Sequence, residues 1–150
     1  PKGRAKVISK DSKSILIDYA HNFGGIQAIV NSVSNIYQDL ITIYGCGGER
    51  DSSEREKIMK FTCTNSRKVI FTSDNSRNES FQSILDDSIK DHEYSNLIIE
   101  ADRKRAIKHG IETLKEDEIL LILGKGHEEF QEINGTKTPF NDQKIVEEIL

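Results

Sequence analysis

The sequence predicts an α/β fold of the Rossmann-like kind, in which a mostly parallel sheet carries helices on both faces and a hairpin follows near the C-terminus. Short runs rich in Ile, Val and Leu alternate with segments whose apolar residues recur at spacings of three and four, the periodicities of strands and helices. The runs are apolar throughout, as in strands that are buried on both faces. At 150 residues the chain is expected to form one domain with a substantial core.

Five strands are expected to alternate with four helices along the chain. The predicted strands are residues 14–18, 40–44, 69–72, 97–99 and 118–123. The predicted helices between them are residues 24–37, 53–63, 80–89 and 102–114. In the first helix, Ile26, Ile29, Val30 and Val33 form the apolar face.

The C-terminal segment predicts a hairpin and a last helix. Residues 130–133 and 136–140 are expected to pair across Asn134 and Gly135, because Asn-Gly suits a two-residue type I′ turn. Asn141 or Asp142 is then expected to cap a helix that runs to Leu150.

Composition and charge exclude several classes of partner. The net charge is −4, so we expect no nucleic-acid partner, and no apolar run approaches the ~20 residues that span a bilayer. Cys46 and Cys63 are too few for a disulfide framework, and no metal-ligating motif occurs. We expect a cytoplasmic protein with no metal site. The start at Pro1, without an initiator Met, predicts one domain of a longer chain.

Four polar stretches each follow the end of a predicted strand. They are Asp18–Asn22 (DYAHN), Gly45–Asp51 (GCGGERD), Asp74–Glu79 (DNSRNE) and Gly124–Glu128 (GKGHE). The carboxyl ends of parallel strands lie along one edge, where open α/β sheets bind ligands. We therefore favour a shared binding crevice over four unrelated helix caps. The last stretch is not a P-loop, because no Ser or Thr follows Gly-Lys.

The residue types in these stretches suit a ligand that carries both charges. Arg77 is able to hold a carboxylate through two hydrogen bonds, and Asp74, beside Asn75, is able to pair with an ammonium group. Arg50 offers a second anion contact, and Glu128 a contact for an amine. The alternative is that Asp74 caps the next helix and Arg77 is solvated.

The histidines and the cysteine in the crevice carry weaker signals. For His21 a structural role is favoured over a functional one, and for His127 the two stand about even. Cys46 is interpreted as a small filler, since no acid–base partner is assignable to it. An isolated Gly-x-Gly-Gly is also a weak signal.

Taken in order, the four motifs resemble the C-terminal domain of Mur ligases, in the branch of UDP-N-acetylmuramoyl-tripeptide synthetases. The resemblance runs from Gly3-Arg4 to the end of the chain. It implies a three-domain, ATP-dependent amide ligase whose P-loop, magnesium ligands and carbamylated lysine lie in another domain. This domain alone is then expected to be inactive, with no catalytic residue of its own.

The resemblance also implies roles for residues of this sequence. For ATP contacts it implies Arg4, Asp18 and His21. For the incoming amino acid it implies Arg50, Asp74, Asn75, Arg77, Gly124 and Glu128. The second substrate is then a UDP-muramoyl-dipeptide, held by the rest of the enzyme.

Arg77 favours meso-diaminopimelate as the amino acid, because in this branch such an arginine reads the extra carboxylate. Lysine is the alternative. Ser76 and Phe23 stand where the family usually has proline, and Glu49 stands where it has aspartate. These changes keep open a divergent paralogue with another substrate. A non-catalytic amino-acid-binding module is a further alternative, whereas a cyanophycin-type or folate-type ligase is disfavoured by the third and fourth motifs.

Overall fold

A computed structural model of the chain describes residues 5–150. Its main sheet has six strands in the order β1-β2-β6-β3-β4-β5. The strands are β1 Lys6–Lys10, β2 Lys13–Asp18, β3 Asp39–Tyr44, β4 Lys68–Phe71, β5 Leu97–Ile99 and β6 Glu118–Leu123. The helices are α1 Phe23–Ser34, α2 Arg55–Asn65, α3 Phe81–Ile89, α4 Arg103–Thr113 and α5 Asp142–Ile149. A separate hairpin consists of β7 Phe130–Ile133 and β8 Thr136–Pro139.

The mostly parallel sheet predicted from the apolar runs is confirmed. Strands β2, β6, β3, β4 and β5 are all parallel to one another. Only β1, at one edge, runs antiparallel to β2. The predicted order of elements did not include β1 as a defined strand. Its side chains are exposed or half-buried, so it lacks the continuous apolar run that identifies an inner strand.

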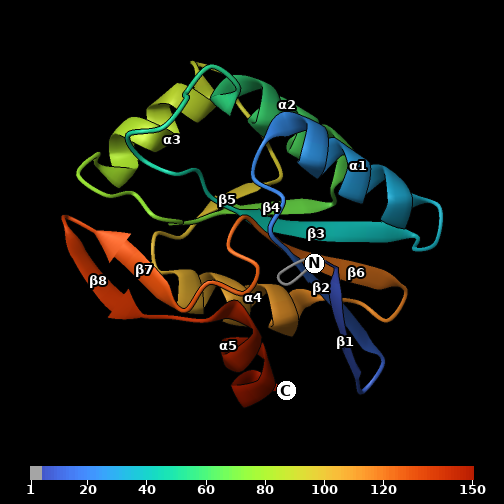
Figure 1. The fold of residues 1–150 in the computed structure, drawn as a ribbon. Helices are drawn as coiled ribbons and strands as arrows, with labels where there is room; N and C mark the ends of the chain where they lie inside the picture. Colours follow the sequence, from blue (N-terminus) through green and yellow to red (C-terminus); the bar gives the residue numbers. More distant parts are fainter. Residues whose placement is uncertain (1–4) are drawn as a thin grey trace.

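Helices cover both faces of the sheet, as Figure 1 shows, with α1, α2 and α3 on one side and α4 and α5 on the other. The strand residues alternate between the two layers, because successive side chains point to opposite faces. Leu121 packs in the core beneath α1–α3, whereas Leu120 and Ile122 pack beneath α4 and α5. Each inner strand is thus buried on both sides, the physical reason for its apolar sequence.

Helix ends differ from the prediction by up to three residues. Helix α1 ends at Ser34, and α2 runs from Arg55 to Asn65. Of the two candidate caps for α5, Asn141 is the one observed, since its side chain accepts a hydrogen bond from the Lys144 amide. Among residues 5–150, no helix combines the length and apolarity that crossing a membrane requires.

The hairpin forms the predicted turn and lies against the loop after β4. Asn134 and Gly135 both have positive φ, 53° and 74°, as a type I′ turn requires. The Arg77 amide donates to the Glu132 carbonyl over 3.0 Å, and the Asn134 amide donates to the Arg77 carbonyl. The hairpin therefore supports the backbone of the loop that carries Arg77.

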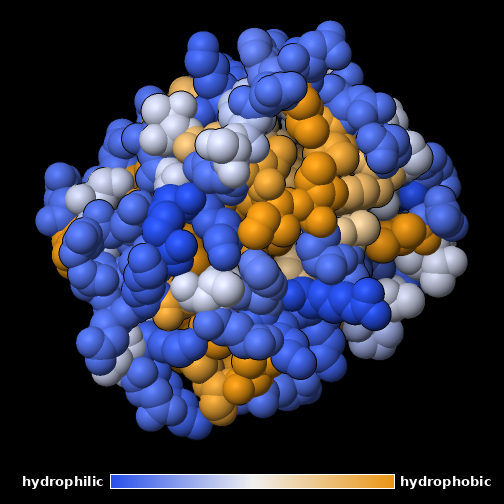
Figure 2. Space-filling view, turned by 180° about the vertical axis from the view of Figure 1, so that it is seen from behind, coloured by the Kyte–Doolittle hydropathy of each residue, from blue (hydrophilic) through white to orange (hydrophobic). Residues whose placement is uncertain are grey.

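Figure 2 looks at the molecule from behind, on the β5 edge of the sheet, where apolar side chains gather on the surface. Ile99 of β5 is 48% exposed. Together with Ile89, Tyr94 and Leu97 it lines a shallow groove.

Candidate functional site

The carboxyl ends of β2, β3, β4 and β6 open onto a cavity of about 490 Å³. All four polar stretches contribute to its lining, so the predicted shared crevice is confirmed. Seven of the predicted site residues line it: His21, Arg50, Asp74, Asn75, Arg77, Gly124 and Glu128. Asp18 does not line it, and Arg4 lies outside the described residues.

Asp74 forms part of the cavity floor. Its side chain is buried, and burial raises the pKa of its carboxyl, while the charges of Arg103 and Lys125 oppose that rise. It does not cap the following helix, because Ser80 does so. Gly124 makes this arrangement possible: its φ is +110°, and a Cβ there would stand 2.5 Å from Asp74 Oδ2. Only glycine allows both the backbone conformation and the close approach.

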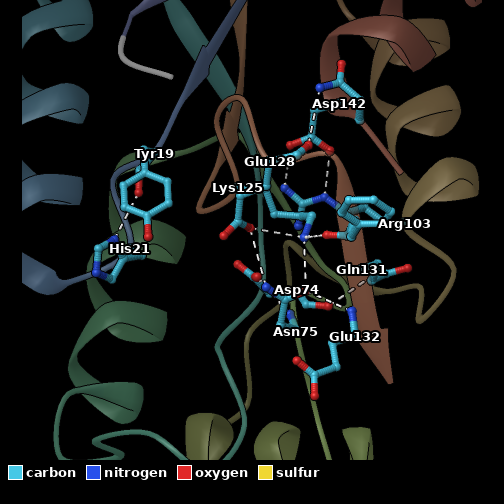
Figure 3. Close-up of polar contacts among 12 residues, drawn as sticks. Tyr19, His21, Asp74, Asn75, Arg103, Lys125, Glu128, Gln131, Glu132 and Asp142 are labelled. Carbon is cyan, nitrogen blue, oxygen red and sulfur yellow. Dashed lines mark hydrogen bonds and ion pairs between the residues drawn. The ribbon is translucent and has the colours of Figure 1, made fainter. Parts of the chain in front are cut away.

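One wall of the cavity is a hydrogen-bonded cluster drawn in Figure 3, in which the side chains of Asn75, Lys125 and Glu128 converge. Lys125 Nζ lies 3.0 Å from Asn75 Oδ1 and 3.1 Å from Glu128 Oε1. The lysine is fully buried and does not itself line the cavity. The sequence did not identify Lys125 as a site residue, because the Gly-Lys-Gly run lacks the Ser or Thr of a P-loop and gave the lysine no other role.

Arg77 is half-buried rather than solvated, with a left-handed backbone at φ 55°. Its Nη1 donates to the Gly48 carbonyl over 3.0 Å and to the Asn75 carbonyl over 3.1 Å. The carbonyls of Gly48 and Asn75 thus both accept from Nη1 and hold the Arg77 guanidinium at the cavity. Arg50, by contrast, is exposed at the opening.

Arg55 is a second residue that sequence reasoning missed. It lines the cavity from the start of α2 and is almost fully buried. Its guanidinium donates to both carboxylate oxygens of Glu79 over 2.8 and 2.9 Å and to the Gly47 carbonyl over 3.0 Å. This hydrogen bonding lowers the pKa of Glu79 from 4.5 to about 2. The pair braces the Gly45–Asp51 loop, and its members are too far apart in sequence to be paired by a local pattern.

The loop after β2 combines the buried carboxylate of Asp18 with a half-buried Tyr19 ring and an exposed His21 ring. Asp18 accepts hydrogen bonds from the backbone amides of Ala5 and Ala20 over 2.6 and 2.7 Å. Tyr19 lines the cavity, and its ring lies edge-on to His21 with centroids 4.8 Å apart. His21 Nδ1 is 3.0 Å from the Tyr19 carbonyl, so this nitrogen carries the proton and Nε2 points elsewhere.

Cys46 lines the cavity, whereas His127 does not. His127 is exposed, with its ring centroid 6.5 Å from that of Tyr19. Burial raises the pKa of the Cys46 thiol to about 12, which agrees with its interpretation as a filler. Among residues 5–150, no three His, Cys, Asp or Glu side chains are grouped to hold a metal ion.

With this geometry in place, the comparison with known families is decisive. Residues 3–126 match the family described as "Mur ligase, glutamate ligase domain". The chain belongs to the Mur ligase family. The resemblance drawn from the four motifs is therefore confirmed.

Two curated relatives of this Mur ligase domain carry the same name. The chain is 40% identical over 150 residues to a UDP-N-acetylmuramoyl-L-alanyl-D-glutamate--2,6-diaminopimelate ligase of Aquifex aeolicus, covering 99% of this chain and 31% of that protein. It is 41% identical over 152 residues to the ligase of that name from Leptospira borgpetersenii, covering 98% and 30%. The chain thus spans under a third of the length of these curated relatives.

Solved structures agree on the fold. A structure titled as a ligase of the same name matches with a TM-score of 0.92 and 32% identity, over 99% of this Mur ligase domain and 31% of that chain. Folylpolyglutamate synthase from Thermotoga maritima matches with a TM-score of 0.60 and 23% identity, over 83% and 28%. At that identity the second match shows a shared fold alone.

Proposed function

We propose that this chain is the amino-acid-binding domain of an ATP-dependent amide ligase, one that adds meso-diaminopimelate to UDP-N-acetylmuramoyl-L-alanyl-D-glutamate in cytoplasmic peptidoglycan precursor synthesis. It would be the C-terminal domain of a longer, three-domain enzyme. The observation that carries the proposal is the guanidinium of Arg77, held at the cavity beside Asn75 and Glu128. The name shared by the relatives supports it.

The charges of the cavity match those of the proposed substrate. Diaminopimelate carries two ammonium groups and two carboxylates. Arg77 would bind its distal carboxylate, because a guanidinium presents a planar set of donors, and Glu128 would bind its distal ammonium. The near end of the molecule would then lie toward Arg50 and Asp74, with Gly124 leaving room for it. Asn75 would offer its amide between these two ends.

The nucleotide side of the proposal is carried by the loop after β2. When bound, ATP with magnesium supplies the phosphoryl group that activates the carboxylate of the nucleotide substrate. His21 fits such a ligand, because it lies exposed at the cavity with Nδ1 engaged. Asp18 fits less directly, since its carboxylate already accepts two backbone amides. We propose that it holds the loop while it contacts the ribose, and that Arg4 reaches the phosphates. We assign the magnesium ligands to another domain.

A lysine-adding enzyme is the second candidate, and the departures at Ser76 and Phe23 motivate it. Both are accommodated locally. The Phe23 amide, which proline would lack, donates to Glu54 Oε1 over 3.2 Å, and Ser76 is buried under the loop. Lysine, however, has no distal carboxylate and would leave Arg77 without its partner.

The test is ATP-dependent phosphate release by the full-length enzyme. Assays contain UDP-N-acetylmuramoyl-L-alanyl-D-glutamate with meso-diaminopimelate, L-lysine or L-ornithine in separate reactions. Release with diaminopimelate alone is the expected result. Release with lysine instead would replace the substrate while keeping the reaction. Silence with all three would favour a divergent paralogue or a non-catalytic module.

The Arg77→Ala variant tests the carboxylate contact itself. Loss of a buried charge-assisted contact costs about 2–5 kcal/mol, or about 30- to 4,000-fold in kcat/KM. The loss should fall on diaminopimelate and spare any activity with lysine. Arg105→Ala is the matched control, because Arg105 is exposed on α4 and does not line the cavity. Equal losses on both amino acids would contradict the role of Arg77.

A further inference from the structure

Behind the cavity wall that contains Asn75 and Glu128 lies Lys125, a lysine with no exposed surface. Lys125 is 0% exposed, which is rare for lysine unless its charge is paired. Its ammonium group has three hydrogens and finds three acceptors: Asn75 Oδ1 at 3.0 Å, Glu128 Oε1 at 3.1 Å and the Phe130 carbonyl at 2.8 Å. Its donor capacity is therefore filled from within the protein, and none is left for a ligand.

These contacts fix the orientation of Asn75. Its Oδ1 also accepts a hydrogen bond from the Glu132 amide over 3.0 Å. Because Oδ1 accepts from two donors, the side-chain amide of Asn75 cannot be flipped without placing its NH2 group against them. In this orientation Nδ2 is directed at Glu128 Oε1, 3.4 Å away. Figure 3 shows this closed arrangement of Lys125, Asn75 and Glu128.

The same contacts fix Glu128. Its Oε1 accepts hydrogen bonds from both Lys125 Nζ and Asn75 Nδ2. For Oε2 no protein partner is found among residues 5–150, and the Glu128 side chain is 32% exposed where it lines the cavity. One oxygen of the carboxylate thus bonds to the protein, and the other has no protein partner among these residues, on a side chain that lines the cavity.

We propose that Lys125 is a positioning residue for substrate selection, which holds Glu128 so that its Oε2 meets the distal ammonium of the amino acid. This inference rests on the proposed function and extends it to a residue that never touches the substrate. A glutamate one-third exposed would otherwise be free to change rotamer, and ordering it on binding would lower affinity. The buried ammonium group does this ordering in advance.

The alternative is a purely structural role for Lys125, in which its bond to the Phe130 carbonyl anchors the hairpin. The two roles differ in what they predict for substrate discrimination. 2-Aminopimelate keeps both carboxylates of diaminopimelate and lacks the distal ammonium. A positioning role concerns that ammonium alone, whereas a loosened hairpin would weaken both compounds alike, because the hairpin also supports Arg77.

The experiment compares full-length wild-type enzyme with Lys125→Met. It measures kcat/KM for diaminopimelate and the inhibition constant of 2-aminopimelate. Side chains in one network couple by about 2- to 150-fold, and we expect kcat/KM for diaminopimelate to fall about tenfold or more. The inhibition constant of 2-aminopimelate should change less than about threefold. Lys144→Met is the matched control: Lys144 is 72% exposed and pairs with the neighbouring Glu129 at 3.6 Å.

A double-mutant cycle sharpens the assignment. If Lys125 acts through Glu128, Glu128→Gln should lose the same discrimination, and the double variant should be no worse than the poorer single variant. Losses that multiply, or a parallel weakening of both compounds, would overturn the proposal.

Failure of the proposed function is recognised separately, as absence of wild-type activity with diaminopimelate. In that case the Lys125 network is tested without substrate, by measuring the NMR resonances of the Asn75 side-chain amide in the 150-residue chain. A shift of these resonances in Lys125→Met, absent in Lys144→Met, supports the network. Unchanged resonances would refute it.

Discussion

The ion pair between Arg103 and Asp142 gives the sharpest prediction about stability. Both side chains are 0% exposed. Asp142 Oδ1 and Oδ2 accept from Arg103 Nε and Nη2, each over 2.8 Å. The same guanidinium donates to the carbonyls of Ser73 and Leu123 over 3.1 and 3.2 Å. These two residues immediately precede Asp74 and Gly124, so the pair ties α4 and α5 to the cavity floor.

Asp142→Asn should remove the charge that compensates a fully buried guanidinium. Breaking such a pair from one side costs about 3–5 kcal/mol, a large share of the ~5–15 kcal/mol that stabilises a typical domain. At about 2–4 °C per kcal/mol for a chain of this size, Tm should fall by about 6–20 °C. Arg103→Met should lose a comparable amount. Their double variant should lose clearly less than the sum, because it leaves no unpaired buried charge.

The assay is urea unfolding of the chain followed by circular dichroism. Lys104→Met and Glu148→Gln provide the control, since this pair spans 3.9 Å with side chains 61% and 63% exposed. Exposed pairs contribute about 0–1 kcal/mol. A loss below about 1 kcal/mol in Asp142→Asn, or strict additivity in the double variant, would refute the reasoning.

Two further predictions concern the loops around the cavity. Hydrogen bonds from Arg55 lower the pKa of Glu79 from 4.5 to about 2, so the pair stabilises the fold above about pH 4.5 and this contribution is lost as the pH falls toward 2. Glu79→Gln should therefore lower the free energy of unfolding by roughly 1–3 kcal/mol at neutral pH and by almost nothing near pH 2. An equal loss at both pH values in urea unfolding would contradict this. Gly48→Ala should destabilise the chain by about 1–3 kcal/mol and raise KM for diaminopimelate, because its Cβ would stand 1.8 Å from the Ser76 carbonyl oxygen. Gly24→Ala, with its nearest contact at 3.9 Å, should leave both unchanged, and similar behaviour of the two variants would count against the clash.

The sequence by itself determined the inner strands, the helices and the edge of the sheet at which the cavity lies. Inner strands buried on both faces need continuous apolar runs, and the polar stretches had to follow them at the edge where the chain turns. Strand β6 was predicted at its observed bounds, Glu118–Leu123. Its last five residues are all apolar, and Glu118 marks where the strand begins. The pair Asn134-Gly135 likewise predicted the type I′ turn of the hairpin, because few other pairs of residues both adopt positive φ readily.

The tertiary structure alone decided which polar residues are buried together. The sequence did not identify Lys125, Arg55 or Arg103 as residues of the site or the core. Each is nevertheless buried against partners between 3 and 50 residues away, and Lys125 has both a near and a distant partner. Periodicity reports which face of an element is apolar, whereas the pairing of charges depends on which elements meet in space. The loop after β4, the GKGHE turn and the hairpin come together only once the sheet has formed. For that reason the sequence predicted the pocket, and the fold decided which of its side chains line the cavity.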